Sequence, residues 1–266
     1  MDESKVPEVV PFHFPGASDA PTERTASSAD ARPLLPPVDG VVIAWNDVLV
    51  DASSWRRWLQ CILRQRGFDL ATDELWALWR VGEVDVFAGR RSFSSALIAF
   101  LQSLGLEEGE ARELAAAVWG QTAQWDAEVR LFPQAADFLK LLRSGGLRTV
   151  VLADSVYRRE TFVDRFSATG VFDLIDAVCL SRESGFALPE AGAFAAAWNA
   201  LGLPPTRTAF VARRRDDLEA AYRLGMVAIA VSASPVSGPF YQASCLTEVG
   251  DWLLAPGSRR GESAAG

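Results

Sequence analysis

Two different hydrophobic periods divide the chain into segments. Residues 41–45 form a short apolar run rich in β-branched side chains, a pattern typical of a buried strand. From Ser53 or Ser54, which are both suitable helix caps, apolar residues recur at helical spacing as far as Gly67. Helical spacing also covers residues 72–80, 92–104 and 108–124. We therefore expect a strand followed by an all-helical block over residues 52–128.

Beyond this block the pattern alternates between helix and strand. Helices are expected at residues 134–144, 158–168, 191–201 and 218–224, and strands at residues 148–153, 177–180, 208–212 and 227–231. Such alternation predicts right-handed crossovers and a parallel, doubly wound sheet, here a Rossmann-like α/β core with an inserted all-helical cap. Ligands of these sheets bind beyond the carboxyl ends of the strands. Functional positions are therefore expected at and after Ala44, Ala153 and Ala212.

The two ends of the chain have no apolar period. Residues 1–38 are rich in proline and small polar residues, and such a segment buries too little apolar surface to offset the entropy of ordering it. We expect disordered tails at residues 1–38 and 256–266, a core over residues 39–51 and 129–255, and the cap over residues 52–128. A docking motif around Val9-Val10-Pro11-Phe12 is the alternative to a solvated tail.

Tryptophans are frequent in the helical block. The residues concerned are Trp76, Trp79, Trp119 and Trp125. Aromatic side chains at these spacings most often form a core, and the alternative is a cap that faces an apolar ligand.

Composition and charge narrow the function classes. The chain has 266 residues, of which 49% are hydrophobic and 23% charged, as in globular proteins with one or two cores. A formal charge of -8 argues against a basic face for nucleic acid or anionic membranes. No apolar run approaches the roughly 20 residues of a membrane span, and the first segment lacks the pattern of a signal peptide. The sequence predicts a soluble, cytoplasmic protein without nucleic-acid or membrane partners.

Few of the residues that enzymes commonly use are available. The single histidine, His13, lies in the expected tail, so a mechanism with a positioned histidine base is disfavoured. Cys61, Cys179 and Cys245 lie far apart and form no CxxC or Cys/His cluster that would hold a metal. We expect buried, reduced thiols.

Four short stretches resemble the haloacid dehalogenase-like superfamily, especially its phosphoglycolate phosphatase-like group with a helical cap. The resemblance covers about residues 39–255. Its most specific stretches are Val48-Leu49-Val50-Asp51, Leu131-Phe132-Pro133, Ser181-Arg182-Glu183-Ser184-Gly185 followed by Pro189, and Leu224-Gly225-Met226. It implies a hydrolase fold with a phosphotransfer site at the ends of the strands.

In that superfamily the first strand ends in an aspartate nucleophile, and a second aspartate two residues later acts as general acid and base. The resemblance puts Ala44 and Asn46 at these positions, and neither side chain supports that chemistry. Asp47 stands where glycine is usual. Its use as the nucleophile is the alternative, but it would shift the register and put Leu49 in the acid/base place.

The other motif positions have changed as well. Ala153 replaces the hydroxyl residue that holds the phosphoryl group, with Ser155 as a nearby alternative. Leu188 occupies the position of a neutralising lysine. Ala212 replaces the leading magnesium ligand, while Asp216 or Asp217 retains the trailing one. Magnesium needs several oxygen ligands, so we expect neither a metal nor another cofactor. Magnesium is expected only if the protein is a hydrolase.

These replacements predict a noncatalytic protein, or pseudo-phosphatase. The expected ligand-binding residues are Asn46, Asp47, Asp154, Arg213, Asp216 and Asp217. Residues 213–215 are all arginines and could hold a phosphorylated or carboxylate small molecule without metal, or else extend into solvent or pair with Asp216, Asp217 and Glu219. A protein partner that binds the cap or the tail is a second alternative. A hydrolase that acts on a small phosphate ester is the third.

Overall fold

The computed structural model describes residues 33–255. The tails expected at residues 1–32 and 256–266 lie outside the described residues. Of the remaining part of the expected amino-terminal tail, Leu35 and Val38 are buried, with 2% and 1% of their surface exposed, and both pack in the core. The described chain thus contributes to the core ahead of the first strand.

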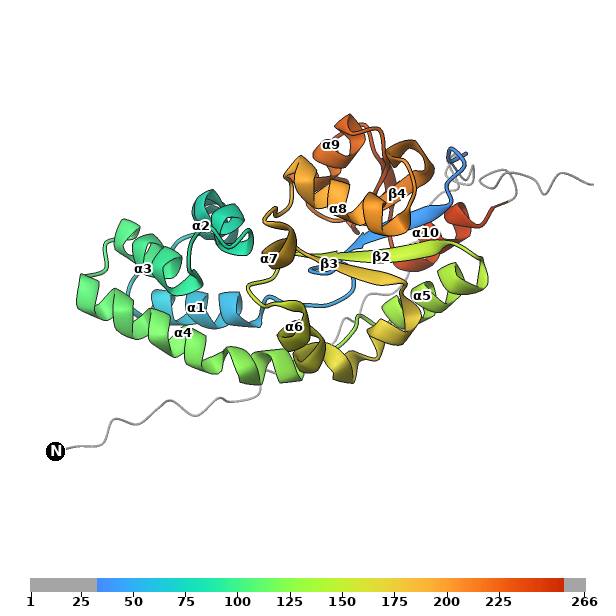
Figure 1. Ribbon diagram of the computed structural model, residues 1–266. Coiled ribbons are helices and arrows are strands. Elements are labelled where there is room, and N and C mark those ends of the chain that lie inside the picture. The colour runs from blue at the N-terminus through green and yellow to red at the C-terminus, as the bar shows by residue number, and fades with distance from the viewer. Residues whose placement is uncertain (1–32, 256–266) are drawn as a thin grey trace, which may run out of the picture. The chain divides into compact units, whose positions relative to one another are not determined.

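A six-stranded parallel sheet forms the core, with the strand order β3-β2-β1-β4-β5-β6 (Figure 1). The strands are β1 (Gly40–Ala44), β2 (Arg148–Ala153), β3 (Ala177–Leu180), β4 (Thr208–Ala212), β5 (Val227–Val231) and β6 (Tyr241–Ala243). This arrangement confirms the predicted α/β, Rossmann-like fold. Strand β6 was missed because three residues are too few to show a hydrophobic period.

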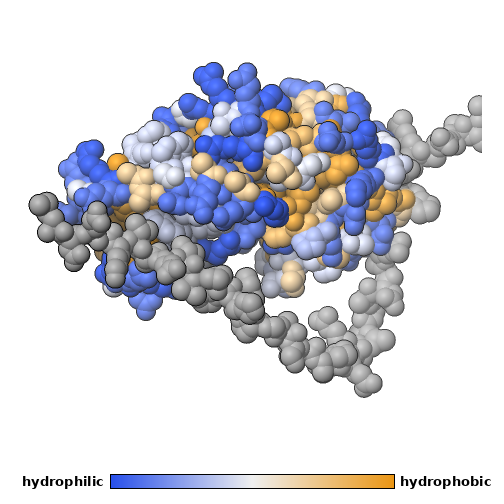
Figure 2. All heavy atoms as spheres, turned by 90° about the horizontal axis from the view of Figure 1, so that it is seen from below, coloured by the Kyte–Doolittle hydropathy of each residue, from blue (hydrophilic) through white to orange (hydrophobic). Residues whose placement is uncertain are grey.

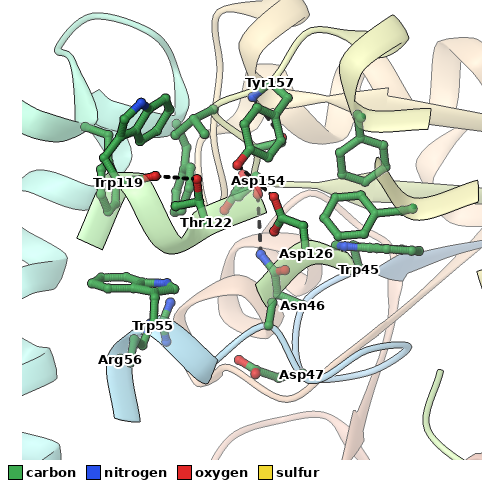
Figure 3. Close-up of a pocket in the computed structure, with 17 residues that line it drawn as sticks. Trp45, Asn46, Asp47, Trp55, Arg56, Trp119, Thr122, Asp126, Asp154 and Tyr157 are labelled. Atoms are coloured by element: carbon green, nitrogen blue, oxygen red, sulfur yellow. Dashed lines mark hydrogen bonds between the residues drawn. The ribbon is translucent and has the colours of Figure 1, made fainter. Parts of the chain in front are cut away.

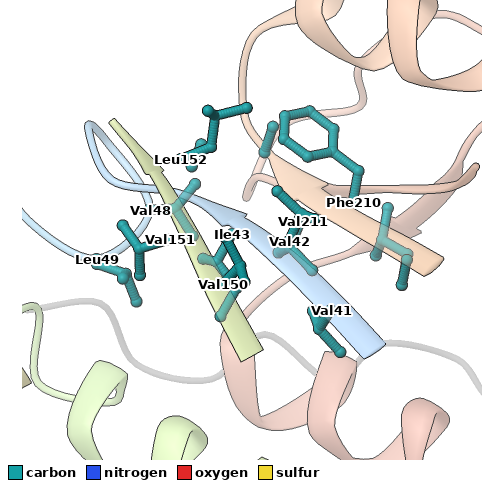
Figure 4. Packing of buried hydrophobic residues seen from close by; sticks show 14 of the residues in the cluster. Val41, Val42, Ile43, Val48, Leu49, Val150, Val151, Leu152, Phe210 and Val211 are labelled. Atoms are coloured by element: carbon teal, nitrogen blue, oxygen red, sulfur yellow. The ribbon is translucent and has the colours of Figure 1, made fainter. Parts of the chain in front are cut away.

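The central strands are buried on both faces, which explains their continuous apolar sequence. Every residue of β1, β4 and β5 is buried. Figure 4 shows the aliphatic side chains of β1, β2 and β4 packed beside one another. Helices α8 and α9 cover one face of the sheet, and α5 and α10 cover the other (Figure 1). Parallel sheets need this double cover, since β-branched side chains project from both faces.

Five helices lie in sequence between β1 and β2, and we call the first four of them the cap. They are α1 (Ser54–Gln65), α2 (Thr72–Phe87), α3 (Phe93–Ser103) and α4 (Glu108–Glu128). The helices of the core are α5 (Ala135–Ser144), α6 (Arg159–Phe166), α7 (Ser181–Ser184), α8 (Ala191–Leu201), α9 (Arg215–Arg223) and α10 (Leu246–Leu253). The pattern had predicted that the second cap helix ends at residue 80. The helix in fact continues to Phe87. The prediction ended too early because the buried position 83 is a glutamate, which interrupts the apolar period.

The cap has a hydrophobic cluster of its own, separate from that of the sheet. Trp76 and Trp79 are buried in it, as predicted, whereas Trp119 is 44% exposed and was wrongly expected in the core. The three cysteines are free, but Cys61 is exposed, contrary to the expectation of buried thiols. Over the face seen in Figure 2, hydrophobic residues gather more densely on the half that holds the sheet than on the cap. Within residues 33–255, no helix combines the length and apolarity that a membrane span requires.

Candidate functional site

The carboxyl ends of three neighbouring strands meet at one edge of the sheet. Ala44 at the end of β1 pairs with Leu152 of β2, and Ile43 pairs with Val211 of β4. The strand order therefore brings Ala44, Ala153 and Ala212 together, as the pattern had indicated. All three alanines are buried and present only methyl groups.

A narrow crevice lies beyond Ala44, between the ends of these strands and the cap. Its volume is about 20 Å³, room for about one water molecule. The residues that line it are Ala44, Trp45, Asn46, Asp47, Arg56, Glu83, Phe87, Leu152, Asp154, Leu188, Arg214 and Asp217. Charged side chains from both the cap and the core fill most of the space at the strand ends.

Glu83 is the centre of these charges, which we call the charge network. Glu83 is 3% exposed, and one of its carboxylate oxygens accepts hydrogen bonds from Arg56 at 2.9 Å and from the Trp79 indole at 3.2 Å. Arg214, from the loop after β4, donates to the other Glu83 oxygen at 3.3 Å. The Nε of Arg214 lies 3.7 Å from a carboxylate oxygen of Asp217. The arginine therefore links the core to the cap across the crevice.

Asp154, directly after β2, is the second acidic residue of the crevice. Its carboxyl accepts a hydrogen bond from the Leu188 backbone N–H at 3.0 Å, and its backbone oxygen accepts one from the Asn46 amide at 3.4 Å. Burial, together with the nearby Asp217, raises the pKa of Asp154 to about 8. Burial also raises the pKa of Asp217 to about 6, against the opposing effect of Arg214. At neutral pH Asp154 is thus mostly protonated, and the charges of Arg56 and Arg214 are balanced by Glu83 and Asp217.

The three arginines after β4 diverge. Arg213 is exposed, and its guanidinium lies 5.4 Å from the ring centroid of Phe132, outside the crevice. Arg215 pairs with Glu219 at 2.7 Å. Only Arg214 enters the crevice, where it is already paired with carboxylates. The structure therefore has the alternative in which the three arginines extend into solvent or pair with carboxylates, and not a cluster of three arginines around one anion.

The other candidate residues fall into two groups. Asn46, Asp47, Asp154 and Asp217 all line the crevice, whereas Asp216 is exposed and does not line it. Ser155 does not line the crevice, and its hydroxyl accepts a hydrogen bond from the Tyr157 N–H at 3.0 Å.

Sequence reasoning missed Arg56 and Glu83, the two crevice charges supplied by the cap. Neither belongs to a local motif, and their approach to Arg214 depends on how the cap packs on the core. The available signal was the position of Glu83 within an otherwise apolar helical stripe.

A second, larger hollow adjoins the crevice, and we call it the aromatic chamber (Figure 3). Its volume is about 110 Å³. The residues that line it are Trp45, Asn46, Asp47, Ala52, Trp55, Arg56, Phe87, Phe93, Trp119, Thr122, Asp126, Asp154, Ser155, Val156, Tyr157, Phe162 and Phe166. Trp45 packs edge-on against Phe162 and Phe166, with ring centroids 5.3 and 5.4 Å apart. The chamber therefore has aromatic walls from both the cap and the core.

A parallel α/β core with a helical cap and a crevice at the strand ends defines the class of capped, Rossmann-like proteins with a hydrolase fold. A family model described as haloacid dehalogenase-like hydrolase matches residues 38–225. The chain belongs to this family.

Several solved structures share the fold. A dehalogenase superposes with a TM-score of 0.62 at 18% identity, over 84% of this chain and 100% of that one. The L-2-haloacid dehalogenase of Xanthobacter autotrophicus, with chloropropionic acid covalently bound, gives a TM-score of 0.56 at 18% identity, over 81% and 98% of the two chains. A phosphatase of the same superfamily from Thermococcus onnurineus gives 0.52 at 18% identity, over 84% and 100%. No curated protein sequence matches the chain.

The resemblance implies a magnesium ion in the crevice, but the residues present do not fit one. One oxygen of Asp217 is buried without a hydrogen-bond partner, which alone would suit a cation. Its other oxygen faces Arg214, however, and Arg56 lies in the same crevice. Within residues 33–255, no group of three or more acidic, histidine or cysteine side chains is placed to hold a metal. A divalent cation needs more oxygen ligands than this crevice offers and would be repelled by its two guanidinium groups.

Proposed function

We propose that this chain is a noncatalytic member of the haloacid dehalogenase-like hydrolase family. The observation that carries the proposal is the crevice itself. At the end of β1, where the family resemblance expects the nucleophile, Ala44 faces a space that the Arg214–Glu83 ion pair largely fills. A methyl group forms no covalent intermediate with a phosphoryl or alkyl group.

The neighbouring residues support the same conclusion. Leu188 is 5% exposed and stands at the position of the family's lysine, so the crevice contains no ammonium group at that point. A lysine there would need carboxylates as partners, because a buried unpaired charge is strongly unfavourable. Arg214 takes over the role of neutralising Asp217. The charged side chains that remain in the crevice thus balance one another, with no need of a substrate or a metal.

The alternative is a hydrolase that uses Asp47 as its nucleophile. Asp47 lines both the crevice and the aromatic chamber and has a left-handed backbone with φ of 65°. Its N–H donates to the Val50 carbonyl at 2.9 Å, so the loop is fixed in the register that puts Asp47 three residues beyond the end of β1. This alternative predicts magnesium-dependent hydrolysis of a small phosphate ester.

The test is a hydrolysis assay on the full chain. Purified protein is incubated with p-nitrophenyl phosphate and magnesium, and separately with L-2-chloropropionate, the substrate class named for a structural relative. We expect rates equal to the protein-free background for the wild type and for Asp47→Asn. Turnover by the wild type that Asp47→Asn abolishes would establish the alternative. Turnover that persists in Asp47→Asn would also contradict the proposal and would point to another nucleophile.

A further inference from the structure

The aromatic chamber leaves an open space between aromatic side chains of the cap and of the core. Trp55 and Trp119 line it from the cap, and Trp45 and Tyr157 from the core (Figure 3). Phe93 of the cap lines it as well. Its volume of about 110 Å³ is of the order that accepts one benzene-sized ring. Flat aromatic walls favour a flat ligand, because edge and face contacts between rings add to the burial of apolar area.

An open groove adjoins the chamber on the cap side. The groove has a volume of about 360 Å³. The residues that line it are Val86, Gly89, Arg90, Arg91, Ser92, Phe93, Trp119, Val156 and Arg182. Phe93, Trp119 and Val156 line both hollows, so the two share a wall. Trp119 is 44% exposed and thus lies where the chamber meets solvent.

Two of the three arginines in the groove lack a carboxylate partner. Arg90 pairs with Asp85 at 2.7 Å and with Glu190 at 3.0 Å. Within residues 33–255, the Arg91 guanidinium donates only to the backbone oxygen of Ser95, and the Arg182 side chain has no hydrogen bond or ion pair. These two guanidinium groups are therefore available to an anion.

Arg182 crosses directly over Gly89. A Cβ at Gly89 would lie 1.7 Å from a guanidinium nitrogen of Arg182, and the glycine has a φ of +76°. The absent side chain at this position leaves the guanidinium against the backbone of the groove. The glycine thus fits the placement of Arg182 beside the chamber wall.

Most charges of the chamber are already compensated. Asp126 is held by Arg165 at 2.7 Å and by the Tyr157 hydroxyl at 2.8 Å, and Asp154 is mostly protonated at neutral pH. Arg56, which also lines the chamber, donates to Glu83 at 2.9 Å. The guanidinium groups without a carboxylate partner that an anion can reach are therefore those of the groove. A ligand that satisfies both hollows has a ring in the chamber and its negative charge in the groove.

We propose that the chamber and the groove together bind a small aromatic anion, with its ring between Trp55 and Trp119 and its carboxylate or phosphate at Arg91 and Arg182. The inference rests on the proposed function only in that the ligand is held and not cleaved. It assigns the anion to arginines of the cap and of α7, and not to Arg213.

The test measures binding by quenching of tryptophan fluorescence and by calorimetry at low salt. The probes are phenylacetate and phenyl phosphate as aromatic anions, phenylacetamide as the neutral analogue, and inorganic phosphate as an anion without a ring. We expect saturable binding of at least one aromatic anion, and binding about tenfold weaker or worse for phenylacetamide and inorganic phosphate. The better aromatic anion tells whether the groove prefers a carboxylate or a phosphate.

Variants separate the two halves of the site. Arg91→Gln combined with Arg182→Gln should weaken the aromatic anion about tenfold and leave phenylacetamide unchanged. Trp119→Ala should weaken both ligands. The matched control is Arg213→Gln, an exposed arginine outside both hollows that should have no effect.

Three results would overturn the inference: no saturation by either aromatic anion up to about 10 mM, equal affinity for phenylacetamide, or full affinity in the double arginine variant.

The fate of phenyl phosphate separates this inference from the proposed function. Phenol release together with arginine-dependent binding would support this site while contradicting the proposed lack of catalysis. Failure of both aromatic anions to bind, without phenol release, would contradict this site alone.

Discussion

Glu83 is a carboxylate inside a helical cluster of tryptophans, and its surroundings explain how a charge persists there. A buried carboxylate is costly unless it is paired and hydrogen-bonded. Glu83 has two guanidinium partners and an indole N–H, so both of its oxygens are satisfied. Asp154 lacks such partners, since its carboxyl accepts only from a backbone N–H. The two acids therefore differ in their surroundings: Glu83 lies between two guanidinium groups, whereas burial without a cationic partner leaves Asp154 mostly protonated at neutral pH.

The raised pKa of Asp154 predicts that stability falls with rising pH. An unfolded chain releases the Asp154 proton near its ordinary pKa of 3.8, whereas the folded protein retains it until about pH 8. Between these values the folded state binds more protons, so the free energy of unfolding decreases as the pH rises. Asp154→Asn keeps an acceptor for the Leu188 N–H but does not titrate. We expect the variant to gain about 3–4 kcal/mol relative to the wild type between pH 5 and pH 8, measured by urea unfolding.

The control for this prediction is Asp137→Asn, since Asp137 is an exposed residue whose side chain is 84% accessible. Its stability difference from the wild type should not change over the same pH range by more than a few tenths of a kcal/mol. Below about pH 6, part of the decrease of the unfolding free energy with rising pH remains in Asp154→Asn, because the pKa of Asp217 is also raised. A parallel pH dependence of wild type and Asp154→Asn would show that Asp154 titrates normally.

Among the helices, α3 has the clearest local start. Ser92 precedes it in an extended conformation, and its hydroxyl accepts a hydrogen bond from the Ser95 N–H at 3.1 Å. This side-chain cap satisfies one of the free N–H groups of the first turn. We predict that Ser92→Ala lowers the free energy of unfolding by about 1 kcal/mol, measured by urea unfolding.

Ser94→Ala, two residues into the same helix, is the matched control. Alanine has the higher helix propensity, so this change should alter stability by about 0.5 kcal/mol or less, in the stabilising direction if at all. An equal loss in the two variants would mean that the cap bond does not stabilise α3.

The elements that the sequence predicted well are short, mostly apolar strands. Strands 148–153, 177–180, 208–212 and 227–231 have the predicted bounds because their apolar runs are bounded by polar or turn residues, a local signal that needs no tertiary information. Helix α2 was predicted too short, because the polar residue that continues its buried face is paired with distant arginines. Helix α10 was not predicted, although five of its eight residues are buried.

The same distinction holds for the candidate site. Residues at strand ends, such as Ala44, Asn46 and Asp154, could be grouped in advance because a parallel sheet aligns its carboxyl ends. Arg56 and Glu83 could not, since they reach the crevice only through the packing of the cap. The roles of the three consecutive arginines were also open, because the direction of each side chain depends on the loop geometry before α9.

For the whole molecule, polar contacts connect the cap with the core in addition to the apolar contact of Val156, which follows β2 and packs against the cap cluster. Glu83 of the cap pairs with Arg214 of the core, and Asp126 of the cap accepts hydrogen bonds from Tyr157 and Arg165. A third link pairs Arg90, in the loop after α2, with Glu190 before α8, and its partners are more exposed. Exposed pairs contribute little to stability, whereas a buried charge that loses its partner is strongly destabilising. The buried link through Glu83 should therefore matter most for holding the cap on the core.

This difference can be tested by amide hydrogen exchange on Glu83→Gln. The amide keeps the shape of the side chain, but it leaves Arg56 and Arg214 without the carboxylate that both contact. We expect a loss of about 2–4 kcal/mol in the free energy of unfolding. We also expect faster exchange in α1 and α2, while β1 and β4 stay protected as long as the sheet core is folded.

Glu110→Gln is the matched control, because Glu110 forms a partly exposed pair with Arg66 within the cap, and its loss should cost about 0.5 kcal/mol or less. Equal exchange in α2 of the wild type and Glu83→Gln would show that aromatic contacts, and not the charge network, hold the cap in place. An equal increase in α2 and β1 would mean that the cap and the core open together as one cooperative unit.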